Sequence, residues 1–224
     1  MKKILMLSML VLGMGFSALA QPKLEDYFVP STATPASPDA KGFVTRWTLL
    51  DPIAKPELRS NDMFTDSWLR NEFSKEYFKD QFTMVPKDGQ KVKLDKTTSL
   101  TWHCFDATRY NVKLYRFAKC LGMRPTEGLF LAVTVINVPE DVTVRFAIGS
   151  NSGSQWWLNG EELLLLSNDR RMVVDDVVSK KVTLKAGKNV IRGAVINGPG
   201  MSDFCMRLYD ENGNIYKNFT VTNQ

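Results

Sequence analysis

The stretch that most constrains the fold covers residues 141–166 and contains two turns between three strands. Apolar residues alternate with polar or small ones over residues 142–148, which is the period of a strand with one buried face. Residues 149–154 are rich in Gly, Ser and Asn and indicate a turn. Asn159-Gly160 tolerates positive φ at both central positions of a hairpin turn. The order of these elements indicates antiparallel β architecture.

Further strands are expected on both sides of this stretch, with turn residues between them. Residues 129–138 are nearly all apolar, which predicts a central strand buried on both faces. Residues 85–96 are polar and are expected to form a hairpin or a loop. The remaining expected strands cover residues 43–50, 99–106, 112–117, 182–184, 190–196 and 204–208.

One short helix is expected near the N-terminus, over residues 65–82. Leu69, Phe73 and Tyr77 recur every four residues, so they share one face of a helix. Thr65 or Asp66 can cap its first turn by accepting from free backbone N–H groups. We expect the aromatic side chains of this helix to pack on the sheets.

Three motifs resemble parts of one family. GSNSGSQWWLNGEE, residues 149–162, resembles the "GSDDG-x-x-V-W-L-N-G-K" core of galactose-binding-like β-sandwich domains. RWTLLDP at residues 46–52 resembles their opening strand, and residues 184–214 resemble their final strands. The resemblance implies an all-β antiparallel jelly roll. It also implies an accessory role, since these domains occur with glycoside hydrolases and acetyl xylan esterases.

The first 20 residues have the features of a signal peptide: a basic start, a short apolar run and Ala18-Leu19-Ala20. Cleavage after Ala20 would release a periplasmic or secreted protein that begins at Gln21. Residues 21–42 are rich in Pro, Ser and Thr and are expected to be flexible, either as a spacer or as a loose tail. The domain itself is expected over residues 43–224. No apolar run is long enough to predict a membrane span.

Charge and cysteine content exclude some functions. The net charge is +5, and loss of Lys2 and Lys3 with the signal peptide lowers it to +3. The charges are mixed in sign along the chain, which argues against nucleic acid as a partner. Cys104, Cys120 and Cys205 lack the C-x-x-C spacing of redox or zinc sites. They are expected to be buried thiols or one disulfide with one thiol left over.

The sequence favours a non-catalytic protein. A serine hydrolase needs a nucleophile, a base and an acid, and His103 is the one histidine of the chain. Residues 149–153 place Asn151 where a nucleophile elbow requires serine, and they lead into a strand rather than a helix. Glu161 with Glu162 is a poor glycosidase pair, because adjacent strand residues point to opposite faces.

A structural calcium ion is the cofactor that the resemblance implies, because galactose-binding-like domains often hold one through loop carboxylates and carbonyls. Asp169, Asp175 and Asp176, with Asn168, are the candidate ligands, since calcium takes six to eight oxygens. The alternative is that they are solvated loop charges. Residues 150–153 replace the family's acidic pair with Asn151-Ser152, which removes two negative charges.

Carbohydrate binding is the remaining chemistry, and Trp157 is its first candidate residue. If Leu158 points inward, Trp156 is in the core and Trp157 is on the outer face. An exposed Trp157, with Gln155, Asn159 and Arg170 nearby, would offer a platform for a sugar ring and polar groups for its hydroxyls. The alternative is that the helix over residues 65–82, or a loop, covers Trp157.

Three functions follow from these observations. The first is a secreted accessory module that binds a glycan or a carbohydrate-active enzyme during polysaccharide use. The second is a carbohydrate-active enzyme such as an acetyl xylan esterase. The third is a structural module that binds other proteins through a sheet face. The lone His103 and the missing elbow argue against the second.

Overall fold

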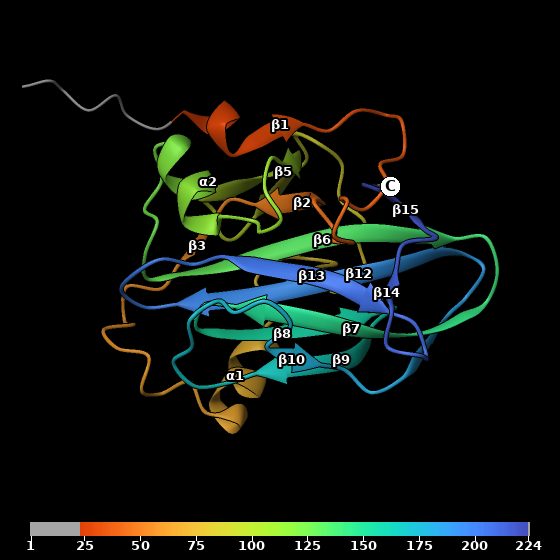
Figure 1. Ribbon diagram of the computed structural model, residues 1–224. Coiled ribbons are helices and arrows are strands. Elements are labelled where there is room, and N and C mark those ends of the chain that lie inside the picture. Colours follow the sequence, from red (N-terminus) through yellow and green to blue (C-terminus); the bar gives the residue numbers. More distant parts are fainter. Residues whose placement is uncertain (1–22, 224) are drawn as a thin grey trace, which may run out of the picture.

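The computed structural model describes residues 23–223, and over that range the chain forms two antiparallel sheets packed face to face (Figure 1). This confirms the predicted all-β sandwich. The predicted signal peptide lies outside the described residues, as do residues 21 and 22 of the segment that follows it.

The larger sheet has ten strands, and its main path runs β1-β5-β2-β6-β12-β8-β9. The strands β3 and β15 pair with β6, and β4 pairs with β5. Its members are β1 (Phe28–Pro30), β2 (Arg46–Leu50), β3 (Ile53–Ala54), β4 (Lys91–Lys93), β5 (Ser99–Ala107), β6 (Gly128–Val138), β8 (Gly153–Leu158), β9 (Glu161–Leu166), β12 (Gly187–Asn197) and β15 (Thr220–Thr222). As predicted, the central strand β6 is buried along almost its whole length.

The smaller sheet has five strands, and its path runs β10-β7-β13-β14, with β11 paired to β7. Its members are β7 (Val142–Ser150), β10 (Val177–Val178), β11 (Val182–Leu184), β13 (Phe204–Tyr209) and β14 (Ile215–Tyr216). The predicted hairpin turn between β8 and β9 is confirmed, since Asn159 and Gly160 both have positive φ, 51° and 91°.

The main core lies between the two sheets. Trp156 is fully buried there, and its ring meets Trp47 and Phe204 edge to face, at centroid distances of 5.8 Å and 4.9 Å. Gly193 on β12 is required beneath it, because a Cβ at that position would lie 2.2 Å from the Trp156 ring. This packing fixes which face of β8 points inward.

A second core covers the outer face of the larger sheet, beneath α1 (Asp66–Phe73). Thr65 caps this helix by accepting from the backbone N–H of Trp68, as predicted. The predicted extension to residue 82 is wrong. The Gln81 side chain accepts from the Tyr77 N–H and donates to the Lys75 carbonyl, so it takes backbone groups that a longer helix would use.

A second helix, α2 (Leu114–Cys120), occupies a segment that the sequence predicts as a strand. Only Val112 pairs with a strand residue, Phe204. The smaller sheet has too few strands to cover β5 and β1, and α2 closes this end of the core. Phe117 contacts Phe28 and Phe105 there, at centroid distances of 6.3 Å and 6.2 Å.

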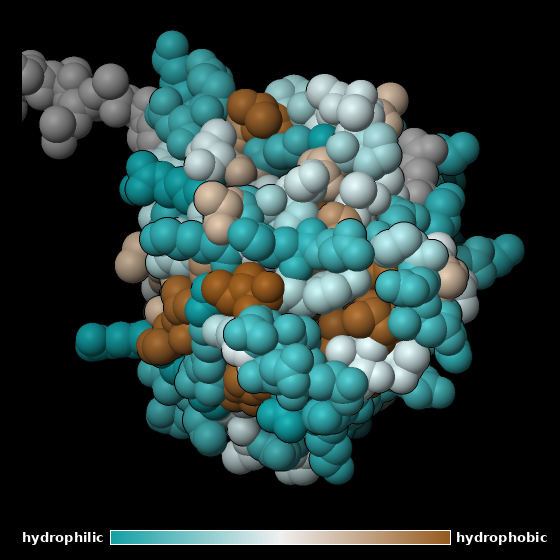
Figure 2. Space-filling view, turned by 45° about the vertical axis from the view of Figure 1, so that its right-hand side comes forward, coloured by the Kyte–Doolittle hydropathy of each residue, from teal (hydrophilic) through white to brown (hydrophobic). Residues whose placement is uncertain are grey.

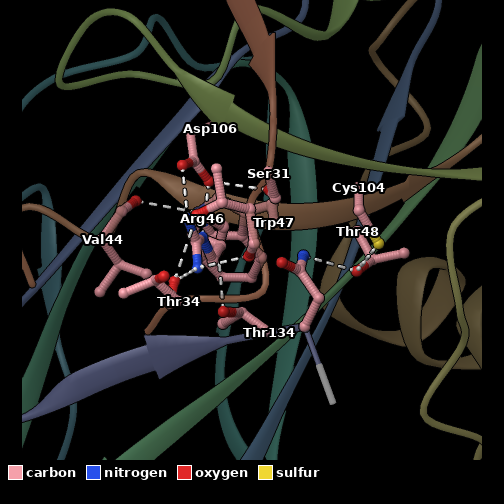
Figure 3. A network of polar contacts seen from close by, with 11 residues as sticks. Ser31, Thr34, Val44, Arg46, Trp47, Thr48, Cys104, Asp106 and Thr134 are labelled. Atoms are coloured by element: carbon pink, nitrogen blue, oxygen red, sulfur yellow. Dashed lines mark hydrogen bonds and ion pairs between the residues drawn. The ribbon is translucent and has the colours of Figure 1, made fainter. Parts of the chain in front are cut away.

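Part of the segment before residue 43, which the sequence predicts to be flexible, pairs with the larger sheet from Phe28 onward. A 3₁₀ turn (Leu24–Asp26) precedes β1, and β1 pairs with β5. Arg46 fixes the next residues, because it donates to both carboxylate oxygens of Asp106 and to the carbonyls of Thr32 and Thr34 (Figure 3). The local pattern does not reveal these contacts, because they join residues from 12 positions apart, as in Thr34 and Arg46, to 185 apart, as in Ala36 and Val221.

Within residues 23–223 no helix is long and apolar enough to cross a membrane. Cys104 and Cys205 are both buried and neither forms a disulfide. Burial raises the pKa of Cys205 to about 12, so its thiol stays protonated.

Candidate functional site

Trp157 lies on the outer face of the larger sheet, opposite Trp156, but it is only partly exposed. The Phe73 ring of α1 stands edge-on to it at a centroid distance of 6.5 Å. The helix therefore covers part of Trp157, which is the alternative that the sequence left open. The helix that covers Trp157 is some 85 residues earlier in the sequence, so strand alternation alone could not reveal it.

Gln155 lies on the same face as Trp157, but its side chain is hydrogen-bonded to the neighbouring strand β9. It is 5% exposed, and its Nε2 donates to Oε2 of Glu162 at 2.8 Å. Arg70 of α1 pairs with the same Glu162 oxygen. Gln155 therefore helps to join α1 to β9 rather than facing solvent.

Asn159 and Arg170 lie at opposite ends of β8. The Asn159 side chain accepts from the Val190 N–H at 2.8 Å, just after the strand ends. The Arg170 carbonyl accepts from the Ser152 N–H, just before the strand begins. The strand between them has six residues and spans roughly 20 Å. The structure therefore brings together Trp157 and Gln155 but not all four predicted residues.

The predicted calcium ligands each face a hydrogen-bond donor. Asp169 accepts from the Asn61 amide at 2.7 Å, and Asp176 pairs with Arg170 at the same distance. Asp175 pairs with Arg207 and accepts from the Tyr209 hydroxyl. No group of three or more His, Cys, Asp or Glu side chains in the described range is placed to hold a metal. Each of these carboxylates is bonded to a different side chain, whereas calcium needs six to eight oxygens around one point.

His103 is oriented by a carboxylate. Its Nε2 lies 2.8 Å from Oδ1 of Asp51, whose other oxygen accepts from the Thr101 N–H. The ring stacks on Phe105, with an interplanar angle of 3°. Among residues 23–223, the second ring nitrogen forms no hydrogen bond to a hydroxyl or a thiol. The pair therefore supplies a base and its acid but brings no nucleophile to them.

A concave surface on the smaller sheet collects aromatic and cationic side chains, and we call it the aromatic pocket. Its volume is about 400 Å³, within the usual range of small-molecule sites. It is lined by Lys41, Phe43, Tyr110, Val174 and Arg207.

Tyr110 and Phe43 form the apolar part of the aromatic pocket. Their ring centroids are 5.2 Å apart, and Phe43 is buried while Tyr110 remains 39% exposed. Phe43 is held by a bridge to Arg207 on β13. A buried ring thus supports an exposed ring, which leaves the outer face of Tyr110 accessible to a ligand.

Arg207 is fixed in the aromatic pocket by an ion pair and by two rings. Its guanidinium lies 4.9 Å from the Phe43 centroid and 5.3 Å from that of Tyr209. Burial opposes ionisation of the partner Asp175, but hydrogen bonds from Arg207 and Tyr209 outweigh it and lower the Asp175 pKa. The same hydrogen bond raises the pKa of Arg207. Both groups are charged at neutral pH and rigidly placed.

The loop between β9 and β10 forms the wall of the aromatic pocket. The Val173 carbonyl lies so close to Gly149 on β7 that a Cβ there would be 1.8 Å from its oxygen. Asn151 accepts from the Met172 N–H at 2.7 Å and fixes the loop from its other side. Figure 2 shows that apolar side chains form separate islands on a mainly hydrophilic surface.

Sequence reasoning did not identify the residues of the aromatic pocket. Phe43, Tyr110 and Arg207 come from three segments: Phe43 and Arg207 lie in predicted strands, and Tyr110 lies between two predicted strands, at residues 99–106 and 112–117. Of the predicted site residues, only Asp175 is involved, through Arg207. Tyr110 follows a strand directly within a polar loop, which is the one local feature that could have indicated an exposed aromatic residue.

A second groove, of about 420 Å³, lies on the outer face of the larger sheet beside the N-terminal segment. It is lined by Ser31, Thr32, Ala33, Arg46, Asp88, Cys104, Lys188, Thr222 and Asn223. Its floor is occupied by structural contacts: Arg46 pairs with Asp106, and Asn223 donates to the Thr48 hydroxyl (Figure 3). It has no aromatic side chain, so we favour the aromatic pocket as the site.

No protein-family model matches the sequence, and no curated protein matches it. Among solved structures, a PA14 sugar-binding domain from an RTX adhesin has a TM-score of 0.45 and 9% identity, covering 80% of this chain and 95% of that chain. The PA14 domain of the antifreeze protein MpAFP has a TM-score of 0.45 and 12% identity, covering 87% and 95%. A Kluyveromyces marxianus β-glucosidase in complex with glucose has a TM-score of 0.37 and 21% identity, covering 55% and 16%. Similarity at these TM-scores does not assign the chain to a family.

Proposed function

We propose that this chain is a non-catalytic carbohydrate-binding module, and that a sugar ring lies against Tyr110 in the aromatic pocket. The observation that carries the proposal is the exposed Tyr110 ring, supported from below by Phe43. The apolar C–H face of a pyranose fits an aromatic ring, and such sites need a few fixed polar groups for orientation.

The polar groups beside Tyr110 suit a ligand rich in hydroxyls. Arg207 is immobilised by Asp175, so little conformational freedom remains for a ligand to remove. Lys41 is exposed, and its ammonium group is a donor at the rim of the pocket. The two cations and the one carboxylate leave a net positive charge, which favours glycans that carry uronic acid or other acidic groups.

A glycan array probed with the mature protein tests this proposal. Binding should concentrate on a small group of plant or microbial polysaccharide fragments, with acidic ones first. Tyr110→Phe keeps the ring and should retain the profile. Tyr110→Ala removes the platform and should lose it. A wild-type protein that binds no glycan, or a Tyr110→Ala variant with an unchanged profile, would contradict the proposal.

The module is proposed to act outside the cytoplasm, next to a separate carbohydrate-active enzyme. This rests on the signal-peptide features of residues 1–20 and on the resemblance to galactose-binding-like accessory domains. Mass spectrometry of the protein from its native envelope should find Gln21 as the first residue. An N-terminus that still carries residues 1–20 would argue against export by this route.

A hydrolase is the second candidate, because Asp51 orients His103 as the acid of a catalytic triad orients its base. We expect no turnover of aryl acetates or acetylated xylan above background, since no nucleophile among the described residues is hydrogen-bonded to His103. Turnover that disappears in His103→Ala would favour the hydrolase.

A further inference from the structure

A small cavity lies beneath α1, on the outer face of the larger sheet and remote from the aromatic pocket. Its volume is about 30 Å³, which is roughly two water-sized spheres. Its walls are mostly aromatic and aliphatic side chains, including Phe73, Phe82 and Trp157. Five lining residues carry polar side-chain groups: Tyr77, Gln81, Trp102, Trp157 and Arg192.

Two of these polar residues have partners within the protein. The Tyr77 hydroxyl contacts Glu72 and Lys55, and the Gln81 amide bonds backbone groups of Lys75 and Tyr77. These groups are therefore satisfied without a ligand. They form part of the cavity wall. The polar groups without a partner in the described range belong to Trp102 and Arg192.

Arg192 is a buried cation without a counter-charge. It is 9% exposed, its side chain forms no hydrogen bond or ion pair with any residue of the described range, and its Nη1 is fully enclosed. Burial alone lowers its pKa to about 10, so it remains charged at neutral pH. A buried charge without a partner is costly, which is why such groups are normally paired.

Trp102 provides a second donor without an acceptor. It is 1% exposed, and its indole N–H has no hydrogen-bond partner among residues 23–223. Trp102 on β5 and Arg192 on β12 both line the cavity, and each carries a donor atom without a partner in the described range. No carboxylate lines this cavity. A group that accepts hydrogen bonds and carries negative charge would satisfy both donors.

We propose that this cavity binds a small monovalent anion, a halide or the head of a carboxylate, held by Arg192 and by the Trp102 indole N–H. The volume admits chloride, bromide or formate and excludes larger anions such as gluconate. Apolar walls strengthen the attraction between the guanidinium and an anion, because water is largely excluded from between them. The site is independent of the carbohydrate proposal.

Thermal melts at constant sodium and constant ionic strength test the site, with gluconate replaced stepwise by chloride, bromide or formate. The melting midpoint of the wild-type protein should rise with at least one of these anions, in proportion to the logarithm of its concentration above the dissociation constant, because a ligand of the folded state stabilises it by mass action. Arg192→Met keeps the length of the side chain without its charge and should abolish the rise.

Two further variants keep the test decisive. Trp102→Phe retains the ring but removes the N–H, and it should weaken the apparent affinity at least about tenfold, because a hydrogen bond to a charged group is lost. Arg145→Met alters an exposed strand arginine on the other sheet and should leave the rise intact. If Arg192→Met does not fold, the Trp102→Phe shift alone decides the outcome.

Bromide diffraction separates the two sources of the anion. An anomalous peak beside Arg192 indicates a halide site, whereas a rise with formate and no bromide peak indicates a carboxylate site. A wild-type melting midpoint that does not rise with any of the three anions would overturn the proposal. So would a rise of the same size in Arg192→Met or in Trp102→Phe.

Discussion

Neighbouring tryptophans on β8 show how a single strand divides its residues between two environments. Trp156 is fully buried between the sheets, whereas Trp157 is partly covered by α1. Truncation of Trp156 to Ala should cost about 3–5 kcal/mol and largely unfold the protein. Trp157→Ala should cost less, about 1–3 kcal/mol, because part of its surface already faces solvent. Denaturant unfolding of both variants provides the comparison, and equal losses would contradict the assigned environments.

The buried carboxylate of Glu72 makes stability depend on pH. Burial would raise its pKa, but hydrogen bonds from Lys55, Lys75 and Tyr77 outweigh this and lower it to about 2 from an ordinary 4.5. The folded-state pKa is thus below the unfolded value. The stabilisation, about 3 kcal/mol, is therefore complete above pH 4.5 and lost as the pH falls toward 2.

Glu72→Gln tests this pH dependence. The variant should be less stable than wild type at pH 7, and the difference should shrink as the pH falls from 4.5 toward 2. Denaturant unfolding at several pH values measures the stability of both proteins. Because both contain the same other carboxylates, the contributions of those groups cancel in the difference. A difference that stays constant over this range would show that Glu72 does not titrate as described.

The sequence pattern predicted the features that depend only on residues close together in the chain. The Asn159-Gly160 turn and the inward position of Trp156 follow from turn chemistry and alternation, and both are found. The covering of Trp157 and the pairing of Asp175 with Arg207 depend on segments at least 30 residues away. Such contacts are set by tertiary packing, which one strand's pattern does not contain.

At the scale of elements, one ion pair between β2 and β5 helps to hold the residues that follow β1 against the larger sheet. Arg46 is 3% exposed and donates to both oxygens of Asp106, which also accepts from Ser31 (Figure 3). Asp106→Ala leaves a buried guanidinium without its partner and should cost about 3–5 kcal/mol. Hydrogen exchange should also speed up at the Ser31 amide, which bonds the Cys104 carbonyl.

Two further variants separate the lost ion pair from a general effect of removing a charge. Glu211→Ala breaks an exposed pair with Lys181 and should change stability by less than about 1 kcal/mol. The double variant Arg46→Met with Asp106→Leu replaces the buried pair by apolar groups and should recover most of the loss. Asp106→Ala with unchanged exchange at Ser31 would contradict the anchoring role.

Helices were the elements that the sequence predicted least well. The apolar residues of α2, Leu114 with Phe117 and Ala118, have helical spacing, but the run is short and follows Val112, which does pair as a strand. The helix α1 begins where its cap predicts and ends early, because Gln81 bonds the backbone after it. The apolar spacing alone therefore misplaced the end of α1 and the type of α2.

At the scale of the whole molecule, the larger sheet separates two cores and the smaller sheet carries the proposed site. The sequence predicted the antiparallel sandwich from its strands and turns, and the structure confirms it. The aromatic pocket was not predicted, because Phe43, Tyr110 and Arg207 come together only when Phe43 pairs with β13 and the loop after β5 brings Tyr110 against the Phe43 ring.

The most direct test of the carbohydrate proposal is a calorimetric titration of the array-selected glycan into three folded proteins: wild type, Tyr110→Ala and Trp157→Ala. Tyr110→Ala should bind at least about 30-fold more weakly, as expected when an aromatic anchor worth about 2 kcal/mol is removed. Trp157→Ala should bind as wild type does. Unchanged affinity in Tyr110→Ala, together with loss of binding in Trp157→Ala, would place the glycan on the larger sheet and contradict the proposed site.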